Sequence, residues 1–159
     1  MRILYYNHDM YKSHYNSPVG ILEIICEKDT LISLKLVKNI EKTEKETAFI
    51  KTIKSQLKEY FLGKRQKFNI KINPVGTDFQ KLVWQELQKI PYGKTKSYSE
   101  IAYAIGKPNA QRAVGSACNK NPIMIIIPCH RVISKNGELG GFAYGNSVKQ
   151  TLLKLENTF

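Results

Sequence analysis

Residues 97–119, SYSEIAYAIGKPNAQRAVGSACN, carry the signals of two short helices joined by a tight turn. Ser97 and Glu100 form the Ser-x-x-Glu pattern of a capping box, which starts a helix. Gly106 ends this first helix, and Asn109 is the candidate cap of the second. Two helices with so short a connection are typical of a helix-turn-helix unit, in which the second helix usually enters a DNA groove.

The second helix of this pair has two unlike faces when it is drawn as a helical wheel. Small apolar residues gather on the side expected to face the core: Ala110, Ala113, Val114, Ala117 and Cys118. The opposite side holds Arg112, Gly115, Ser116 and Asn119. A face of small polar residues with one cation lets a helix approach a phosphate backbone closely. Packing of the same small residues against another helix is the alternative, and the wheel leaves it open.

The chain before this unit alternates as strands do and then changes to helical spacing. We expect strands over 19–26 and 32–36, a solvated loop or helix start over 38–47, a helix over 49–61 and a closing strand over 68–72. Turn residues at 73–76 form the expected linker. The sequence therefore predicts two domains, an α/β domain over 1–73 and a mainly helical domain over 74–159.

Two more helices are expected in the second domain. The first covers 79–90, with Thr77 or Asp78 as its cap. The second carries apolar residues at helical spacing near the end of the chain: Val148, Leu152, Leu155 and Phe159. The apolar run Ile123–Ile127 lies between the helices and is interpreted as a buried strand.

The composition favours a soluble protein with an anionic partner. The net charge is +12 and is spread evenly over both parts of the chain, so it points to a polyanion such as nucleic acid without locating a binding face. A merely soluble, lysine-rich surface is an equally good reading of charge alone. The start of the chain lacks the pattern of a secretory signal, and its longest apolar run is too short to span a bilayer. We therefore expect a cytoplasmic protein that does not bind membranes.

Cys129 is the candidate nucleophile. The three cysteines are widely spaced and form no Cys-x-x-Cys pair, so we expect neither a disulfide framework nor a metal site. Cys129 precedes His130 and Arg131, and an imidazole or a cation nearby favours the reactive thiolate. A single cysteine is more often a small buried apolar residue, and this tripeptide shifts the odds without deciding them. Neighbours in a strand point to opposite faces, so His130 need not touch the sulfur of Cys129, and a water molecule between them could carry the proton.

These residues resemble the O6-alkylguanine-DNA alkyltransferases, also called methylated-DNA–protein-cysteine methyltransferases. The resemblance rests on Pro-Cys-His-Arg-Val at 128–132, on 92–102, on Arg-Ala-Val-Gly at 112–115 and on Asn-Pro at 121–122. It covers 76–156 closely and the first domain only in outline. The resemblance implies a ribonuclease-H-like α/β domain followed by a helical domain with a winged-helix-like helix-turn-helix.

The resemblance also assigns reaction roles. Cys129 is the alkyl acceptor, His130 deprotonates it through a water molecule, and Glu156 orients His130. Asn121 holds the turn that positions this segment, and Tyr98 donates a hydrogen bond to the guanine ring and helps to rotate the nucleotide. The implied reaction moves the methyl or alkyl group from O6 of guanine onto Cys129 once and irreversibly, with O4 of alkylated thymine as a further candidate source. It needs no cofactor.

The remaining implied residues bind DNA or the extruded base. Arg112 enters the base stack and fills the gap left by the flipped nucleotide. The carbonyl groups of Cys129 and Val132 accept from the exocyclic amine of guanine, and the N–H near Ala143 lies on O6. The rest of the expected contact set is Ser99, Ala113, Gly115, Ser116 and Arg131. The implied partner is double-stranded DNA bearing O6-alkylguanine, bound by a monomer.

Two departures and three alternatives accompany the resemblance. Phe142 stands where relatives commonly have Tyr, and Tyr144 where they often have a small residue, so we expect a narrower pocket that reacts poorly with benzyl adducts. Some relatives carry a zinc ion in the first domain, but Cys26 lacks partners for one. A lesion-recognition protein would lack Cys129, a thiol hydrolase would need an oxyanion hole, and a helix-turn-helix regulator usually dimerises.

Overall fold

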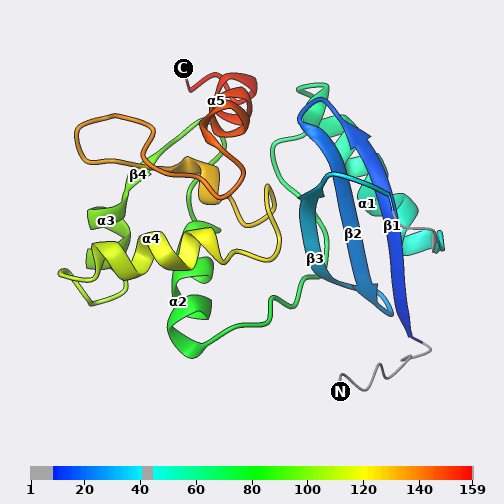
Figure 1. The fold of residues 1–159 in the computed structure, drawn as a ribbon, viewed down its shortest axis with the longest axis horizontal. Coiled ribbons are helices and arrows are strands. Elements are labelled where there is room, and N and C mark those ends of the chain that lie inside the picture. Colours follow the sequence, from blue (N-terminus) through cyan, green and yellow to red (C-terminus); the bar gives the residue numbers. More distant parts are fainter. Residues whose placement is uncertain (1–8, 41–44, 159) are drawn as a thin grey trace.

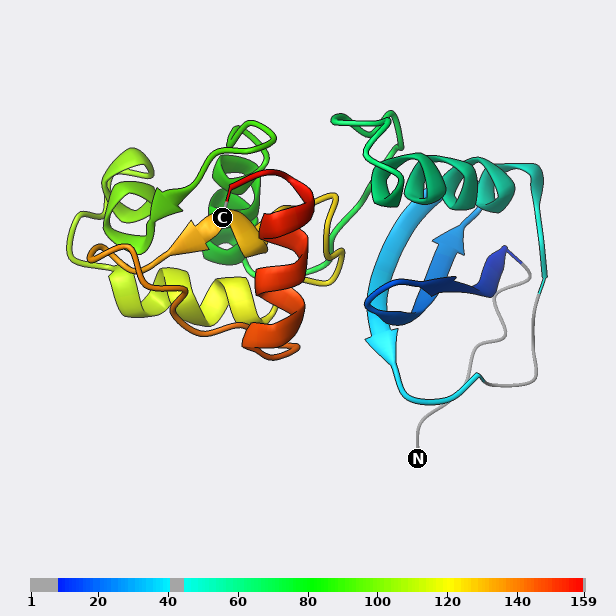
Figure 2. The ribbon, with the colours of Figure 1, turned by 90° about the horizontal axis from the view of Figure 1, so that it is seen from above.

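A computed structural model describes residues 9–40 and 45–158 of the chain (Figure 1). The start of the chain, part of the charged stretch 38–47 and Phe159, which was expected to belong to the last helix, lie outside the described residues. The first three strands and the first helix form one part of the molecule, and the remaining helices form the other together with two short strands (Figures 1 and 2). The expected fold class, an α/β domain followed by a mainly helical domain, is confirmed.

The sheet of the first part has three antiparallel strands in the order β1-β2-β3. Their bounds are Met10–Ser17 for β1, Gly20–Glu27 for β2 and Thr30–Val37 for β3. The first strand was not expected from the sequence. It lacks an apolar alternation, because its two buried residues are the polar Ser13 and His14.

Helix α1 (Ala48–Phe61) packs across one face of this sheet (Figure 2). The hydroxyl of Thr47 accepts a hydrogen bond from the N–H of Ile50 and caps the helix. Its fully buried side chains recur at helical spacing: Ile50, Ile53, Leu57 and Tyr60. Gly63 follows the helix with φ +73°, a conformation that glycine adopts without strain. The predicted helix over 49–61 is therefore confirmed.

The predicted closing strand over 68–72 is wrong as a strand. Phe68, Ile70 and Ile72 are more buried than the residues between them, so the alternation was read correctly. Only one bridge forms, between Leu31 and Ile72, with the N–H of Leu31 donating to the carbonyl of Lys71. The segment contacts the edge of β3 at this one point and then leaves it toward the second domain.

Four helices build the second part: α2 (Asp78–Leu87), α3 (Tyr98–Ala104), α4 (Gln111–Asn119) and α5 (Asn146–Leu155). Thr77, not Asp78, caps α2, and both α2 and α3 begin with complete capping boxes. Two short strands, β4 (Lys96–Ser97) and β5 (Val132–Ile133), pair in parallel beside them.

Helix α4 differs from the sequence prediction at two points. Asn109 does not cap it, because the N-cap position is Ala110 and no side chain caps the helix. Val114, Ala117 and Cys118 face the core as expected, but Ala113 is exposed. The exposed face of α4 is therefore wider than the wheel indicated.

The run Ile123–Ile127 is buried but is not a strand. It forms turns in which Ile125 has φ +71° and the N–H of Ile127 donates to the carbonyl of Ile123. Leu34 of β3 makes two backbone hydrogen bonds to the start of this segment. Its N–H donates to the carbonyl of Pro122 at 2.9 Å, and its carbonyl accepts from the N–H of Met124 at 3.0 Å. The segment before Cys129 is thus hydrogen-bonded to the sheet of the first domain.

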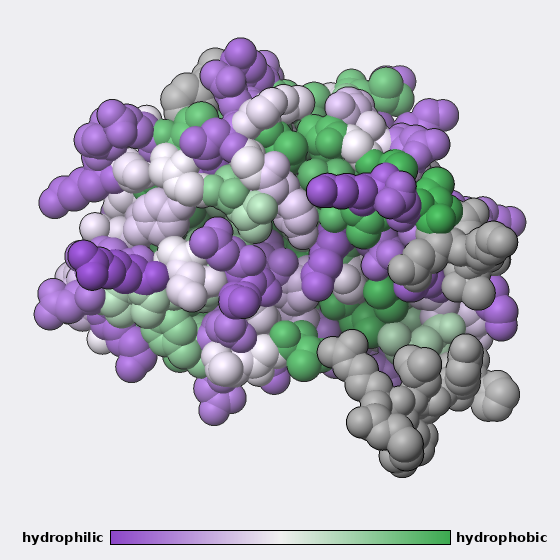
Figure 3. Space-filling model, in the orientation of Figure 1, coloured by the Kyte–Doolittle hydropathy of each residue, from purple (hydrophilic) through white to green (hydrophobic). Residues whose placement is uncertain are grey.

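The surface carries hydrophilic side chains over both parts of the molecule. On the face drawn in Figure 3 they are scattered, with apolar residues between them, and they do not gather in one patch. This agrees with the even distribution of charge along the sequence. Among the described ranges 9–40 and 45–158, no helix is long and apolar enough to cross a membrane.

Candidate active site

Cys129 begins a single 3₁₀ turn, η1 (Cys129–Arg131), directly after Pro128. Its side chain is buried, with 4% of the residue exposed. Burial raises the pKa of the Cys129 thiol, while a hydrogen bond with Asn121 and the charge of Lys149 act in the opposite direction. The thiol therefore needs a base to become the nucleophilic thiolate at neutral pH.

Asn121 closes the loop that leads to Cys129. Its Nδ2 donates to the carbonyl of Ile127 at 2.8 Å, and its Oδ1 accepts from the N–H of Ile123 at 2.9 Å. A buried loop needs such partners, since unpaired backbone groups are costly away from water. The position agrees with the turn-holding role that the resemblance implies.

His130 and Glu156 form a buried pair. The Nε2 atom of His130 lies 2.7 Å from Oε2 of Glu156, and both side chains are fully buried. Burial alone would raise the pKa of Glu156, but hydrogen bonds from His130 and Arg131 outweigh it and lower the pKa to about 2. Glu156 is therefore a carboxylate that can only accept, so the hydrogen of His130 belongs on Nε2.

The other ring nitrogen of His130 carries the lone pair. Burial lowers the pKa of His130 against the raising effect of Glu156, which favours the neutral imidazole. Nδ1 is buried and has no hydrogen-bond partner among the described protein groups. His130 is thus a neutral base, held by Glu156 and next to Cys129 in the same turn.

The structure places Arg131 differently from the sequence expectation of a DNA or substrate contact. Its guanidinium is buried and donates to Glu156 from Nε at 2.7 Å and from Nη2 at 3.1 Å. Nη1 donates to the carbonyl of Ile90 at 2.7 Å. All three guanidinium nitrogens therefore donate to groups within the protein, and Arg131 stabilises the charged form of Glu156.

Lys149 is a site residue that the sequence reasoning missed. It is fully buried, and its Nζ donates to the carbonyls of Val132 at 2.5 Å and Gly141 at 3.2 Å. Burial lowers the pKa of Lys149 to about 8, against the raising effect of Cys129. One signal was available: Lys149 lies two helical turns before Glu156, on the same apolar face of α5 as Leu152.

Tyr98, at the start of α3, faces the loop after β5. Its hydroxyl donates to the carbonyl of Gly141 at 3.2 Å. Gly140 has φ +69°, and an added Cβ would lie 3.1 Å from the Tyr98 ring, so glycine is needed for this approach. Burial raises the pKa of Tyr98 to about 12. The phenol therefore remains a proton donor throughout the neutral range.

Most of the expected DNA-contact residues lie on the accessible side of this site, but Val132 is fully buried, and Arg131 is buried as well. Arg112, Ala113, Ser116 and Ala143 are exposed, and Gly115 and Ser99 are half-buried. A surface hollow of about 310 Å³ joins α3, α4 and the loop after β5, and its lining includes Tyr98, Arg112, Gly115 and Gly141. The fold thus brings the helix-turn-helix face and the Tyr98 hydroxyl to one opening.

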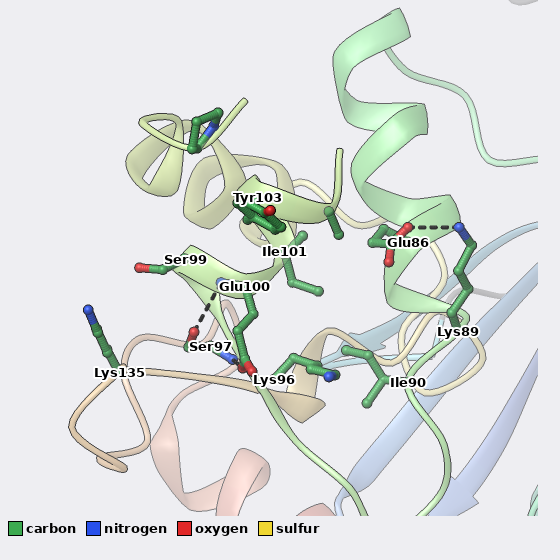
Figure 4. A pocket seen from close by; sticks show the side chains of 12 residues that line it. Glu86, Lys89, Ile90, Lys96, Ser97, Ser99, Glu100, Ile101, Tyr103 and Lys135 are labelled. Atoms are coloured by element: carbon green, nitrogen blue, oxygen red, sulfur yellow. Dashed lines mark hydrogen bonds and ion pairs between the residues drawn. The ribbon is translucent and has the colours of Figure 1, made fainter. Parts of the chain in front are cut away.

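A second cavity, of about 610 Å³, lies between α2 and α3 (Figure 4). Its lining includes Ser99, Tyr103 and the capping box of Ser97 and Glu100, and it contains neither cysteine nor histidine. Ser99 is the one expected contact residue that lines it. The reactive residues are therefore assembled elsewhere, at η1 and α5.

Comparisons with known proteins agree with this arrangement. The DNA-binding domain of 6-O-methylguanine DNA methyltransferases matches residues 78–158, and their ribonuclease-like domain matches 10–74. A Methanosarcina acetivorans methylated-DNA–protein-cysteine methyltransferase is 44% identical over 155 residues, covering 94% of this chain and 99% of its own. A constitutive Bacillus subtilis enzyme of that name is 42% identical over 156 residues, with 92% and 94% covered.

Solved structures of 6-O-methylguanine methyltransferases match the chain as well. The crystal structure of Mycobacterium tuberculosis O6-methylguanine methyltransferase matches with a TM-score of 0.85 and 38% identity, covering 94% of this chain and 93% of its own. The M. tuberculosis protein in complex with DNA matches with a TM-score of 0.83 and 41% identity, with 91% of each chain covered. The chain belongs to the 6-O-methylguanine DNA methyltransferase family.

Proposed function

We propose that this protein repairs DNA by moving the methyl or alkyl group of O6-alkylguanine in a duplex onto Cys129. One observation carries the proposal. A neutral imidazole, His130, adjoins the buried thiol in one turn and is held by a carboxylate with Nδ1 free to accept a proton. The M. tuberculosis relative solved in complex with DNA supports duplex DNA as the partner.

The target atom lies inside a duplex, so the nucleotide must first leave the stack. Arg112 is exposed on α4 at the rim of the hollow beside Tyr98, where it can replace the missing base. Unstacking costs a few kcal/mol by general estimates. A side chain inserted into the gap offsets part of that cost.

The transfer is a displacement at a saturated carbon. His130 takes the thiol proton, through a water molecule, and the sulfur forms a bond to the alkyl carbon as its bond to O6 breaks. The Tyr98 hydroxyl would exchange its hydrogen bond to the Gly141 carbonyl for one to the base. It then donates toward the leaving group, which keeps the electron pair of the broken bond and is protonated to give guanine. The carbonyls of Cys129 and Val132 and the N–H near Ala143 would hold the base.

The product is a thioether, and no group near Cys129 has the chemistry to cleave a carbon–sulfur bond of this kind. A thioester would instead be open to attack by water. Each molecule therefore reacts once, and repair capacity equals the number of unreacted molecules.

Intact-mass measurement after mixing with a duplex that contains one O6-methylguanine tests the proposal. We expect one added methyl per protein, mapped to Cys129, and none in Cys129→Ser. Cys118→Ser is the matched control, since Cys118 is also buried in the same core, and it should still gain the methyl. Tight binding of the lesion with no change in mass would instead indicate a recognition protein without transfer.

Three further features belong to the proposal. We expect a division into domains at 1–73 and 74–159, a monomer in complex with DNA, and a cytoplasmic location. Light scattering of the free and DNA-bound protein tests the monomer. Limited proteolysis near the linker at 73–76 tests the domain boundary.

A further inference from the structure

Tyr60, from the first domain, reaches the catalytic pair of the second. It lies in the last turn of α1, whose end faces the helical domain (Figures 1 and 2). Its hydroxyl donates to Oε2 of Glu156 at 2.6 Å, across 96 residues of sequence. This is the same oxygen that His130 binds at 2.7 Å. A phenol of the α/β domain and the catalytic imidazole therefore share one acceptor atom.

The position of Tyr60 is fixed by packing as well as by this bond. The side chain is fully buried, and its ring packs edge-on against Phe61 at 5.2 Å and Tyr92 at 6.3 Å between centroids. Burial and the neighbouring carboxylate raise the pKa of Tyr60 well above its ordinary value. The phenol thus keeps its proton and acts only as a donor toward Glu156.

We infer that Tyr60 is a positioning residue of the transfer reaction, which sets the basicity of His130 through Glu156. The inference rests on the proposed function and adds a role for the first domain in it. Oε2 of Glu156 accepts from Tyr60, His130 and Arg131. Each donor withdraws charge from the carboxylate, so the phenol weakens the hold of Glu156 on the proton of His130.

The consequence has a definite sign. Without the phenol, the carboxylate would attract the imidazole proton more strongly and stabilise the charged form of His130. The pKa of His130 would rise, and the base would be lost by protonation at a higher pH. Tyr60 therefore keeps His130 neutral and able to accept the proton of Cys129 at the lower end of the physiological pH range.

Tyr60→Phe tests this inference, because it removes the hydroxyl and keeps the ring. The single-turnover rate of methyl transfer would be measured from about pH 5.5 to 9 with saturating lesion duplex. We expect the acid limb of the profile to move up by roughly half to one pH unit. At a given pH on the acid limb, well below the pKa of His130, the rate should fall about 3- to 10-fold, and the rate at pH 8.5 should stay within about twofold of the original.

Tyr92→Phe is the matched control. Tyr92 packs on Tyr60, but its hydroxyl donates to the backbone carbonyl of Leu155 at 3.2 Å and not to the carboxylate. Its profile should match that of the unaltered protein. An unshifted profile in Tyr60→Phe, or a rate lowered equally at every pH, would overturn the inference, since a purely structural role predicts no shift.

Two further measurements cover the remaining outcomes. If Tyr60→Phe does not fold, 3-fluorotyrosine placed at position 60 keeps the shape and makes the phenol a stronger donor, so the acid limb should move down. If the unaltered protein transfers no methyl, the proposed function fails. The effect of Tyr60 on His130 is then still tested by ¹⁵N NMR. The pKa of His130 should be higher in Tyr60→Phe than in the unaltered protein, and the two values would be equal if Tyr60 had no such effect.

Discussion

The carboxylate of Glu156 accepts hydrogen bonds from Tyr60, His130 and Arg131 in a fully buried setting. A buried charge is costly unless it is paired and hydrogen-bonded, and these three donors meet that requirement. The arrangement fixes the tautomer of His130, because a carboxylate can accept from Nε2 but cannot donate to it. The unpaired Nδ1 of His130 follows from this one side chain.

Arg112→Ala should slow repair in duplex DNA without harming the reaction centre. Loss of the inserted side chain removes part of the compensation for unstacking, and we expect a rate about 10- to 100-fold lower. Transfer from free O6-methylguanine base needs no base flipping and should be unchanged. Lys120→Ala, which removes an exposed cation just after α4, is the control. Equal losses on the duplex and the free base would contradict the gap-filling role.

Tyr144 should limit the size of the transferred group. Its ring packs edge-on against Phe142 at 5.8 Å between centroids, and both side chains are half-buried. We expect benzyl transfer to be slower than methyl transfer, and Tyr144→Ala to raise the benzyl-to-methyl rate ratio at least about fivefold, roughly 1 kcal/mol. Tyr103→Ala, an exposed tyrosine of α3, should leave the ratio unchanged. Competition between the two free bases measures it.

Among the elements, α5 and its C-cap present two polar residues on the buried side, Lys149 and Glu156, and each binds a different part of the site. Lys149 and Glu156 lie two turns apart, with Leu152 and Leu153 between them on the buried side. Lys149 binds the carbonyls of Val132 and Gly141, which ties the helix to β5 and to the loop that faces Tyr98. Helix α5 therefore positions His130, the proposed base, together with the loop that faces Tyr98.

Helix α3 depends on its capping box. The hydroxyl of Ser97 accepts from the N–H of Glu100, and the Glu100 carboxylate accepts from the N–H of Ser97 (Figure 4). Ser97→Ala should lower the free energy of unfolding by about 1 kcal/mol, read from urea denaturation. Ser55→Ala, an exposed serine inside α1, should have little effect. A loss in Ser55→Ala as large as in Ser97→Ala would argue against the cap as the cause.

At the scale of the whole molecule, the two domains are joined where the chemistry takes place. Leu34 of β3 holds the loop before Cys129 through two backbone hydrogen bonds, and Tyr60 of α1 binds Glu156. The α/β domain thus supports both the nucleophile segment and its base. We expect the separated helical domain to be a poorer acceptor than the intact chain for this reason.

Stability should fall in acid through Glu156. Its folded pKa is lowered to about 2, so its contribution is complete above the unfolded value near 4.5 and is lost as the pH falls toward 2. The shift corresponds to about 3 kcal/mol. Urea unfolding between pH 6 and 3 should show this slope, and Glu156→Gln should flatten it. The exposed Glu138→Gln is the control. An unchanged slope in Glu156→Gln would contradict the assignment.

The sequence by itself determined the features that depend on near neighbours. The capping boxes of α2 and α3, the amphipathic face of α1 and the helix-turn-helix follow from residues three or four positions apart. The Pro-Cys-His-Arg-Val segment likewise predicted the nucleophile and, through the resemblance, its base, without any long-range contact. Local rules were insufficient at Asn109, where α4 begins without a side-chain cap.

Only the tertiary structure decided the contacts between distant segments. The bond from Tyr60 to Glu156, the inward direction of Arg131 and the burial of Lys149 join residues far apart in the chain. The apolar run before Cys129 became a loop, not a strand, because Asn121 and the edge of β3 satisfy its backbone groups. Periodicity reports that such residues are buried, but their partners depend on which elements meet, and that is fixed only when the domains pack.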